Sequence, residues 1–341
     1  MKKLIFFFLS ISLIASCNET EELALNMNEV KRLSFASHED FKAITEDISK
    51  MNDQELDQWE KNQDFVSFRT VLNTAYKESE TIQTEKDLSQ FLDKYNDILT
   101  LEDSILTPSI KIYTHQAITN RDGIYQTGEY LNKIIGDYVV TADKSRLKIL
   151  KTLNSTDQLQ GKIDGVQIFR YVGPIDQNSI GRTNASCGTN MFASYFKNES
   201  GCRNDREVNL FVTSYRDIST DASGTYYYPK VEIIVQPRKR LGTVCSWTGY
   251  DNPTELRNTS FSIYGWQRLS YTSSGTTSQL ALYSFTLPYV YNPYGNGYKW
   301  TQAIGDWTFN EPVGAFPFTT LHAEGKSQGV GVDGWAVIDC R

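Results

Sequence analysis

The segment Glu207–Val212, with the sequence EVNLFV, is the stretch that decides the fold class. Its apolar side chains at positions 208, 210 and 212 recur with a period of two, which places them on one face of a β-strand. Further segments with the same alternation follow along the chain, at residues 231–235, 261–263 and 281–285. The second half of the chain is therefore predicted to be built from strands.

Short polar stretches containing Gly, Ser and Asn separate these strands. They lie at residues 219–224, 273–277 and 292–297. Short strands joined by such turns are typical of an antiparallel β-sandwich or a flattened barrel. We therefore expect residues 166–341 to form an antiparallel β-sandwich-like domain.

Four cysteines lie in this β-rich part: Cys187, Cys202, Cys245 and Cys340. An even number in an exported chain predicts two disulfides, and four cysteines allow three pairings. We favour Cys187–Cys202, which would close a short polar loop, and Cys245–Cys340, which would tie the last strand back. The spacings contain no C-x₂-C pair, so a zinc site is not indicated and no metal is predicted.

Residues 33–105 are predicted to form a small helical domain. Ser37, Asn52, Ser67 and Thr84 each precede a segment with helical spacing of apolar residues, as helix-capping residues do. Between residues 18 and 103 there are 21 acidic and 9 basic side chains, and many of the acidic ones lie in first turns, where the helix dipole favours them. We interpret this charge as a solvated surface; a site for a cation or a basic partner is the alternative.

Residues 106–165 are expected to form a mixed linking segment. Its Asp122-Gly123 pair is typical of a hairpin turn, because glycine supplies the positive φ that such a turn needs. A helix is expected within residues 144–153, bridging the two halves. The strand pattern places His115 and His322 in strands, and His38 lies in the first turn of a helix.

The N-terminus has the pattern of an export signal. Lys2 and Lys3 precede an apolar run from Leu4 to Ala15, which at about 18 Å of helix is too short to span a membrane. The following residues 14–17, Ile-Ala-Ser-Cys, resemble a bacterial lipobox, in which the cysteine is lipidated. This resemblance implies a signal peptide over residues 1–17 and an anchor to the lipid bilayer at Cys17.

An acidic tether follows over residues 18–32. Its start, Asn18–Glu22, is similar to the surface-export signals of Bacteroidetes lipoproteins, although a simple solvated tether explains it equally well. Outer-membrane attachment is the expectation, and the sequence leaves open which face carries the protein.

Several segments between residues 30 and 150 resemble the opening of uncharacterised outer-membrane lipoproteins of gut Bacteroidetes. They are FAS with Phe41, MNDQE at 51–55, Trp59-Glu60, DFVSF at 64–68 and NRDGIYQTGE at 120–129. Asp64 stands where glycine is usual in those proteins, and Glu129 where aspartate is commoner. The resemblance implies a domain of unknown function and brings no catalytic residue or cofactor with it.

Composition excludes one class of function and weakens another. The net charge is −7 and the pI about 5.2, which argues against nucleic-acid binding. No histidine pair has metalloprotease spacing, and no G-x-S-x-G or P-loop sequence occurs. A glycosidase needs two carboxylates about 5–10 Å apart. Candidate carboxylates exist, but their distances do not follow from sequence: Asp306, Glu311, Glu324, Asp333 and Asp339.

Aromatic side chains between residues 289 and 300 are the strongest functional signal. The five are Tyr289, Tyr291, Tyr294, Tyr298 and Trp300. Such rings in or beside a loop offer flat apolar faces with polar tips, which suit sugar rings or protein surfaces. The competing interpretation is that alternate tyrosines fill the edge of a β-core.

We therefore predict a non-catalytic binding protein of the cell envelope, with a glycan or a host protein as ligand and no cofactor. A glycan-acting secreted hydrolase and a purely structural envelope protein are the alternatives.

Overall fold

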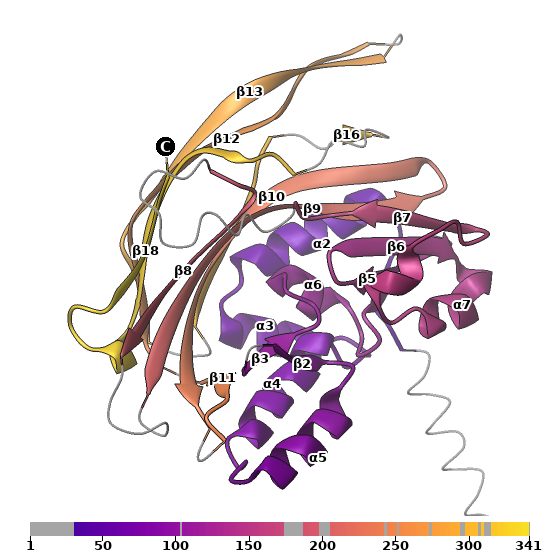
Figure 1. The fold of residues 1–341 in the computed structure, drawn as a ribbon. Coiled ribbons are helices and arrows are strands. Elements are labelled where there is room, and N and C mark those ends of the chain that lie inside the picture. The colour runs from indigo at the N-terminus through magenta and orange to yellow at the C-terminus, as the bar shows by residue number, and fades with distance from the viewer. Residues whose placement is uncertain are drawn as a thin grey trace, which may run out of the picture.

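The chain folds into three β-sheets and a group of helices, which agrees with the predicted α+β class (Figure 1). The computed structural model describes residues 31–102, 104–173, 187–197, 205–241, 244–250, 252–272, 275–293, 297–305, 308–309 and 315–340. Cys17, Cys202 and Tyr294 lie outside the described residues, as does the predicted signal peptide. Within the described part, no helix is long and apolar enough to cross a membrane.

Four helices begin at the predicted capping residues. They are α2 (His38–Lys50), α3 (Asp53–Lys61), α4 (Phe68–Ser79) and α5 (Glu85–Tyr95). In each, the side chain of the capping residue accepts a hydrogen bond from a backbone N–H of the first turn, and such a cap stabilises a helix by about 1 kcal/mol. Asn52 and Thr84 form complete capping boxes with Glu55 and Asp87.

A long hairpin of two strands, β9 (Arg206–Asp221) and β10 (Gly224–Arg240), runs through the middle of the molecule. It is the centre of an eight-stranded sheet with the order β2-β3-β11-β10-β9-β8, in which β15 and β16 also pair with β10. The other strands are β2 (Leu99–Glu102), β3 (Ile105–Pro108), β8 (Asn190–Lys197), β11 (Trp247–Gly249), β15 (Tyr298–Ala303) and β16 (Thr308–Phe309).

A second, five-stranded sheet packs on one face of the first. Its order is β13-β12-β17-β18, with β14 also paired to β12. The bounds are β12 (Thr254–Thr272), β13 (Gly275–Leu287), β14 (Val290–Asn292), β17 (Phe318–Ser327) and β18 (Trp335–Cys340). Val212 and Ile233 of the first sheet share a buried core with Phe261 and Leu321 of the second. This is the sandwich-like arrangement that the alternating segments predict.

The third sheet lies beside the hairpin tip and has its own small core (Figure 1). Its strands are β1 (Ser34–Phe35), β4 (Ile124–Thr127), β5 (Tyr130–Ile135), β6 (Tyr138–Asp143) and β7 (Val166–Arg170). Helix α7 (Leu147–Thr152), which lies within the residues 144–153 where a helix is expected, packs on β6 of this sheet. The 3₁₀ turns are Lys144–Arg146, Thr156–Leu159 and Gln328–Val330.

Two local predictions in the linking segment are wrong. Gly123 has the expected positive φ of 75°, but its turn joins helix α6 (Tyr113–Ile118) to β4 rather than two strands. His115 lies in α6 and not in a strand. All six residues of α6 are buried, and its N-cap residue Ile112 makes no capping hydrogen bond with its side chain. The sequence therefore shows neither an alternation of apolar and polar residues nor a capping residue for this helix.

The predicted disulfide pairing is also wrong. Cys187 bonds to Cys340, 153 residues away, with a Cα–Cα distance of 5.5 Å. The strand register explains this pairing, because Cys340 lies opposite Leu321 in β17 and the start of that strand is hydrogen-bonded to Gly188. This is the one disulfide with both cysteines among the described residues; Cys245 is disulfide-bonded as well.

The other face of the β9–β10 hairpin is covered by the helices. Phe41 of α2 and Tyr215 of β9 belong to one hydrophobic core. Three charged side chains are buried on this face, namely Asp217, Lys230 and Glu232. Both faces of the hairpin are thus buried. One face packs on the second sheet and the other on the helices, and the polar residues of the alternation lie on the helix-covered face.

These buried charges are paired. The Lys230 ammonium lies 2.5 Å from one Asp217 oxygen and donates to Thr45 of α2 at 3.1 Å. His115 Nε2 lies 2.8 Å from the other Asp217 oxygen. Burial raises the pKa of Asp217, but Lys230 and His115 outweigh it and lower the pKa to about 2. The pair fastens α2 and α6 to the sheet.

Candidate functional site

A cavity of about 620 Å³ lies between the helices and the second half of the chain. One wall is the corner between α2 and α3, from Ser49 to Asp53, together with Glu46. The opposite wall is β14 with residues 297–303, which include strand β15, and Tyr113 of α6 also contributes. We call this cavity the groove. Its volume is in the range of sites that bind small molecules.

Three of the five predicted aromatic residues line the groove: Tyr291, Tyr298 and Trp300. Tyr291 is 45% exposed, and its hydroxyl accepts a hydrogen bond from Gln328 at 3.2 Å. Tyr298 and Trp300 are half-buried and pack against the core of the sandwich. Trp300 meets Phe261 edge to face at 5.9 Å between ring centres. These residues therefore take part in the edge of the β-core, as the second interpretation expects, and they also line the groove, where a ligand could bind.

The other two predicted residues are not brought into the groove by the described structure. Tyr289 is 60% exposed, is absent from the groove lining and donates a hydrogen bond to Glu255 at 3.2 Å. Tyr294 lies outside the described residues. Tyr291 lines the groove and Tyr289 does not, so variants of the two residues can be compared in a binding test.

A charged network forms the polar end of the groove. The Tyr113 hydroxyl donates to Asp53 at 2.6 Å and accepts from Arg69 Nε at 3.0 Å. Arg69 also bonds Glu60 and Asp57, each at 2.7 Å. Burial raises the pKa of Asp53, but Lys299, Tyr113 and Arg69 outweigh this and hold it below its usual value. Asp53 is therefore an ionised carboxylate whose charge is already balanced.

Lys299 is the cation nearest to the aromatic wall. Its ammonium lies 3.5 Å from the centre of the Tyr113 ring and 3.8 Å from Asp53 Oδ1. Burial lowers the pKa of Lys299 to about 8, against the opposing effect of Asp53. Strand β15 places this lysine because Lys299 alternates with Tyr298 and Trp300, so its side chain points to the helices while theirs point to the sandwich core.

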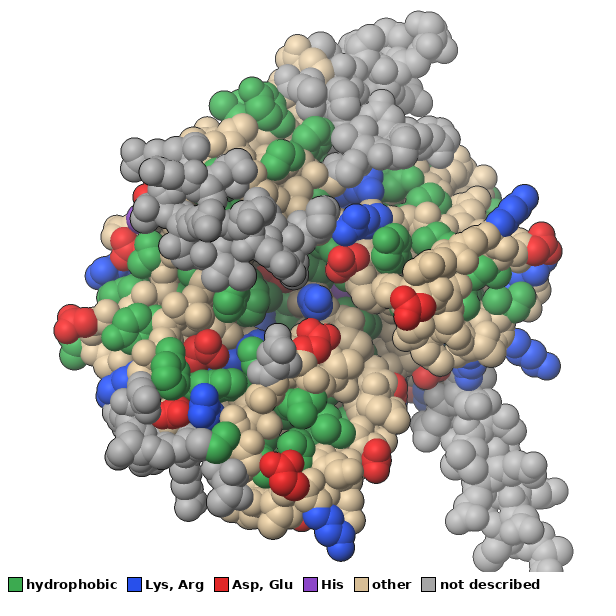
Figure 2. All heavy atoms as spheres, viewed as in Figure 1, with side chains coloured by type: hydrophobic (Ala, Val, Ile, Leu, Met, Phe, Trp, Pro, Cys, Tyr) green, Lys and Arg blue, Asp and Glu red, His purple; other side chains and the backbone are tan. Residues whose placement is uncertain are grey.

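Nothing in the sequence indicates that the α2–α3 corner belongs to the site. The capping box at Asn52 predicts the start of a helix, but nothing in a single sequence brings it beside residues almost 250 positions later. Tyr113 was missed because helix α6 was missed. Acidic and basic side chains are interspersed on the face shown in Figure 2 and do not form a patch of one sign.

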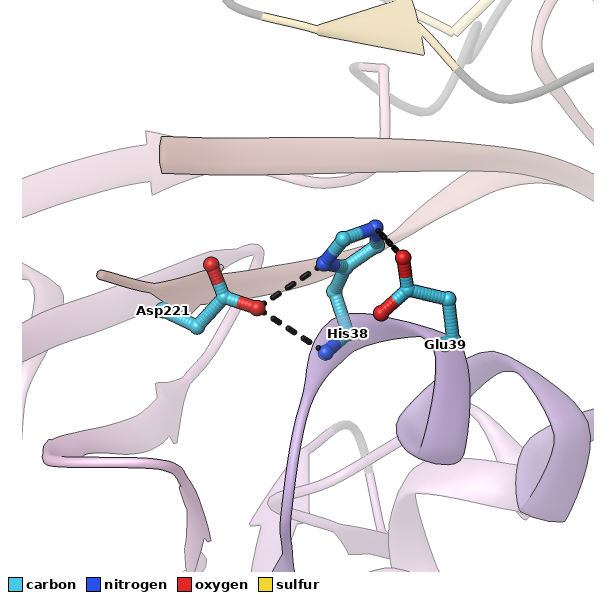
Figure 3. Close-up of side chains that lie close together, drawn as sticks. All are labelled: His38, Glu39 and Asp221. Atoms are coloured by element: carbon cyan, nitrogen blue, oxygen red, sulfur yellow. Dashed lines mark hydrogen bonds and ion pairs between the residues drawn. The ribbon is translucent and has the colours of Figure 1, made fainter. Parts of the chain in front are cut away.

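A second polar cluster, His38, Glu39 and Asp221, is the one group among the described residues with several potential metal-ligand atoms within 4.8 Å of one another. His38 Nδ1 lies 2.8 Å from Asp221, and Nε2 lies 2.8 Å from Glu39. Both imidazole nitrogens are thus engaged by carboxylates (Figure 3), so neither nitrogen is available to a metal ion while these bonds hold.

The cluster therefore acts as a fastening. Asp221 also accepts from the backbone N–H of His38 at 3.0 Å, and Tyr226 stacks on the imidazole at 3.5 Å. These contacts hold the first turn of α2 against the end of the β9–β10 hairpin.

Comparison with known proteins gives one distant match. No protein-family model matches the chain, and no curated protein matches its sequence. The crystal structure of a DUF4848 family protein from Bacteroides thetaiotaomicron aligns over 92% of this chain and 98% of its own, with 14% sequence identity and a TM-score of 0.29. At such a TM-score the alignment supports no inference about the family, fold or activity of this chain.

Proposed function

We propose that this protein is a non-catalytic binding protein of the bacterial envelope whose groove holds a glycan. The observation that carries the proposal is the exposed ring of Tyr291 in the lining of the groove, beside strand residues Tyr298 and Trp300 and opposite the polar α2–α3 corner. Aromatic faces pack against the apolar faces of sugar rings, and nearby amides and carboxylates bond the hydroxyl groups.

The groove also carries polar groups suited to sugar hydroxyls. Asn52, Asn292 and Gln302 are in its lining, with Ser49 and Thr301. Amide side chains offer both donors and acceptors, which matches hydroxyl groups that also do both. A flat protein partner would need a larger apolar surface, so the groove favours the glycan over the host protein.

The binding test compares two tyrosines. We expect saturable binding in a glycan and mucin screen of the purified protein, and Tyr291→Ala should weaken that binding by about tenfold or more, as loss of a stacking aromatic does. Tyr289→Ala is the matched control, since it removes another exposed tyrosine two residues away and outside the groove lining. Equal losses in both variants, or no binding beside a working positive control, would refute the proposal.

Two further measurements test the rest of the proposal. Release of reducing ends from a bound glycan would show a hydrolase in place of a binding protein. The envelope location depends on Cys17, and we expect the protein to incorporate labelled fatty acid in its native host and Cys17→Ser to abolish this. Labelling that persists in Cys17→Ser would refute the anchor.

A further inference from the structure

The groove contains more cationic hydrogen-bond donors than its own residues satisfy. Within the described part of the chain, Lys299 donates no hydrogen bond, although its side chain is 79% buried, with 21% exposed. Its two contacts are the face of Tyr113 and a carboxylate at 3.8 Å. An ammonium group carries three donors, so a ligand acceptor in the groove would complete its bonding.

The carboxylates of the groove, in contrast to Lys299, have their hydrogen-bond or ion-pair partners within the protein. Asp53 Oδ1 accepts from Tyr113 at 2.6 Å and from Arg69 at 3.3 Å. Glu46 lies 3.7 Å from Lys42 on the same helix. Lys50, by contrast, is exposed and makes no ion pair within the described residues. The acidic groups of the groove are therefore paired, while both of its lysines have donors to spare.

We propose that the ligand of the groove is an acidic glycan, whose carboxylate or sulfate bonds to Lys299, with Lys50 at the outer end of the same anionic site. This inference rests on the proposed function and names the class of sugar. An anionic group would bond to the ammonium, and the partly dry surroundings would strengthen that bond relative to water. The exposed ring of Tyr291 would pack against a sugar ring of the same ligand.

The groups around Lys299 make its charge responsive to pH. They come from five elements: Glu46 and Lys50 of α2, Asp53 and Glu60 of α3, Arg69 of α4, Tyr113 of α6 and Glu232 of β10. Burial raises the pKa of Glu232 to about 8, so at neutral pH this group is mostly uncharged and does not neutralise the lysine. Because the pKa of Lys299 is about 8, binding of an acidic glycan should weaken as the pH rises through this value, whereas a neutral glycan should show no such change.

The experiment uses matched pairs of oligosaccharides that differ in the anionic group alone. The pairs are hyaluronan hexasaccharide with its carboxyl-reduced form, sialyllactose with lactose, and keratan sulfate oligosaccharide with its desulfated form. Titration of the purified protein should show the acidic member of at least one pair binding about ten- to a hundredfold more tightly, the range for hydrogen bonds to charged groups. The hyaluronan and sialyl pairs report a carboxylate site, and the keratan pair reports a sulfate site.

Variants separate the charge from the fold. Lys299→Met should remove the preference for the acidic member, Lys299→Arg should keep most of it, and Lys94→Met controls for net charge because Lys94 is exposed and bonded to Glu78 on α4. Equal binding of acidic and neutral members, or an unchanged preference in a folded Lys299→Met, would overturn this inference and leave the glycan groove in place. Failure of every oligosaccharide to bind would overturn both.

Discussion

The buried pair of Lys230 and Asp217 provides the most decisive test of the fold. Lys230→Met keeps the length of the side chain and removes its charge. The side chains of both partners are almost fully buried, with 2% and 0% exposed. Breaking such a pair leaves an unpaired buried charge and costs about 3–5 kcal/mol. His115 still bonds Asp217 in the variant, so the lower end of this range is expected.

The assay is urea unfolding of the purified protein at neutral pH, with the unfolding slope compared between variants. Asp217→Asn alone should cost a similar amount, and the double variant should cost at least about 2 kcal/mol less than the sum, since the two groups interact directly. Lys94→Met breaks an ion pair with 56% and 40% exposed side chains and should cost less than about 1 kcal/mol. A loss below about 1 kcal/mol in Lys230→Met, or strict additivity, would refute the reasoning.

The same pair predicts a response to acid. The pKa of Asp217 is about 2 in the folded chain against an ordinary 3.8, so its contribution is complete above pH 4. It is lost as the pH falls from about 4 to about 2, and amounts to about 2 kcal/mol. Asp217→Asn should remove this part of the pH dependence, which unfolding curves at pH 2 to 5 would measure. An unaltered acid profile in the variant would contradict the assignment.

Three further predictions concern the groove and its support. Gly297 has a φ of 119°, and a Cβ there would lie 2.1 Å from the Val235 carbonyl oxygen; Gly297→Ala should therefore lower the free energy of unfolding by about 1–3 kcal/mol and weaken ligand binding, as thermal melts and titration would show. Asn52→Ala removes a capping box and should cost about 1 kcal/mol in urea unfolding. Cys187→Ser with Cys340→Ser opens a loop of 153 residues and should cost up to about 5 kcal/mol in the chain-entropy model, which the same measurement checks against the oxidised parent protein.

Local chemistry explains what could be predicted from sequence. A capping residue acts on N–H groups two or three positions away, so Ser37, Asn52, Ser67 and Thr84 mark helix starts without knowledge of the fold. The two-residue period of β9 and β10 is equally local. Helix α6 lacks both signals, because all six of its residues are buried and no polar face is left to reveal a period.

Features that depend on distant pairing could not be predicted. The cysteine partners follow from the register of β17 and β18, which a single sequence does not contain. One half of the groove could be predicted from sequence, because Tyr291, Tyr298 and Trp300 lie close together in the chain. The other half, at Asn52 and Asp53, meets them only because β15 pairs with β10 beneath the helices.

The burial of both faces of β10 also bears on the charge of the groove. Glu232 alternates with Val231 and Ile233, and it is 2% exposed beneath α6. Its carboxylate accepts one backbone N–H, that of Tyr113 at 3.1 Å, which is too little to offset burial, and its pKa rises to about 8. A carboxyl group in water would be ionised at neutral pH and would neutralise Lys299. Covering this face of the sheet with helices therefore leaves Lys299 with its long ion pair to Asp53 and no charge on Glu232, and the expected preference for an acidic ligand depends on the packing of α6 on β10.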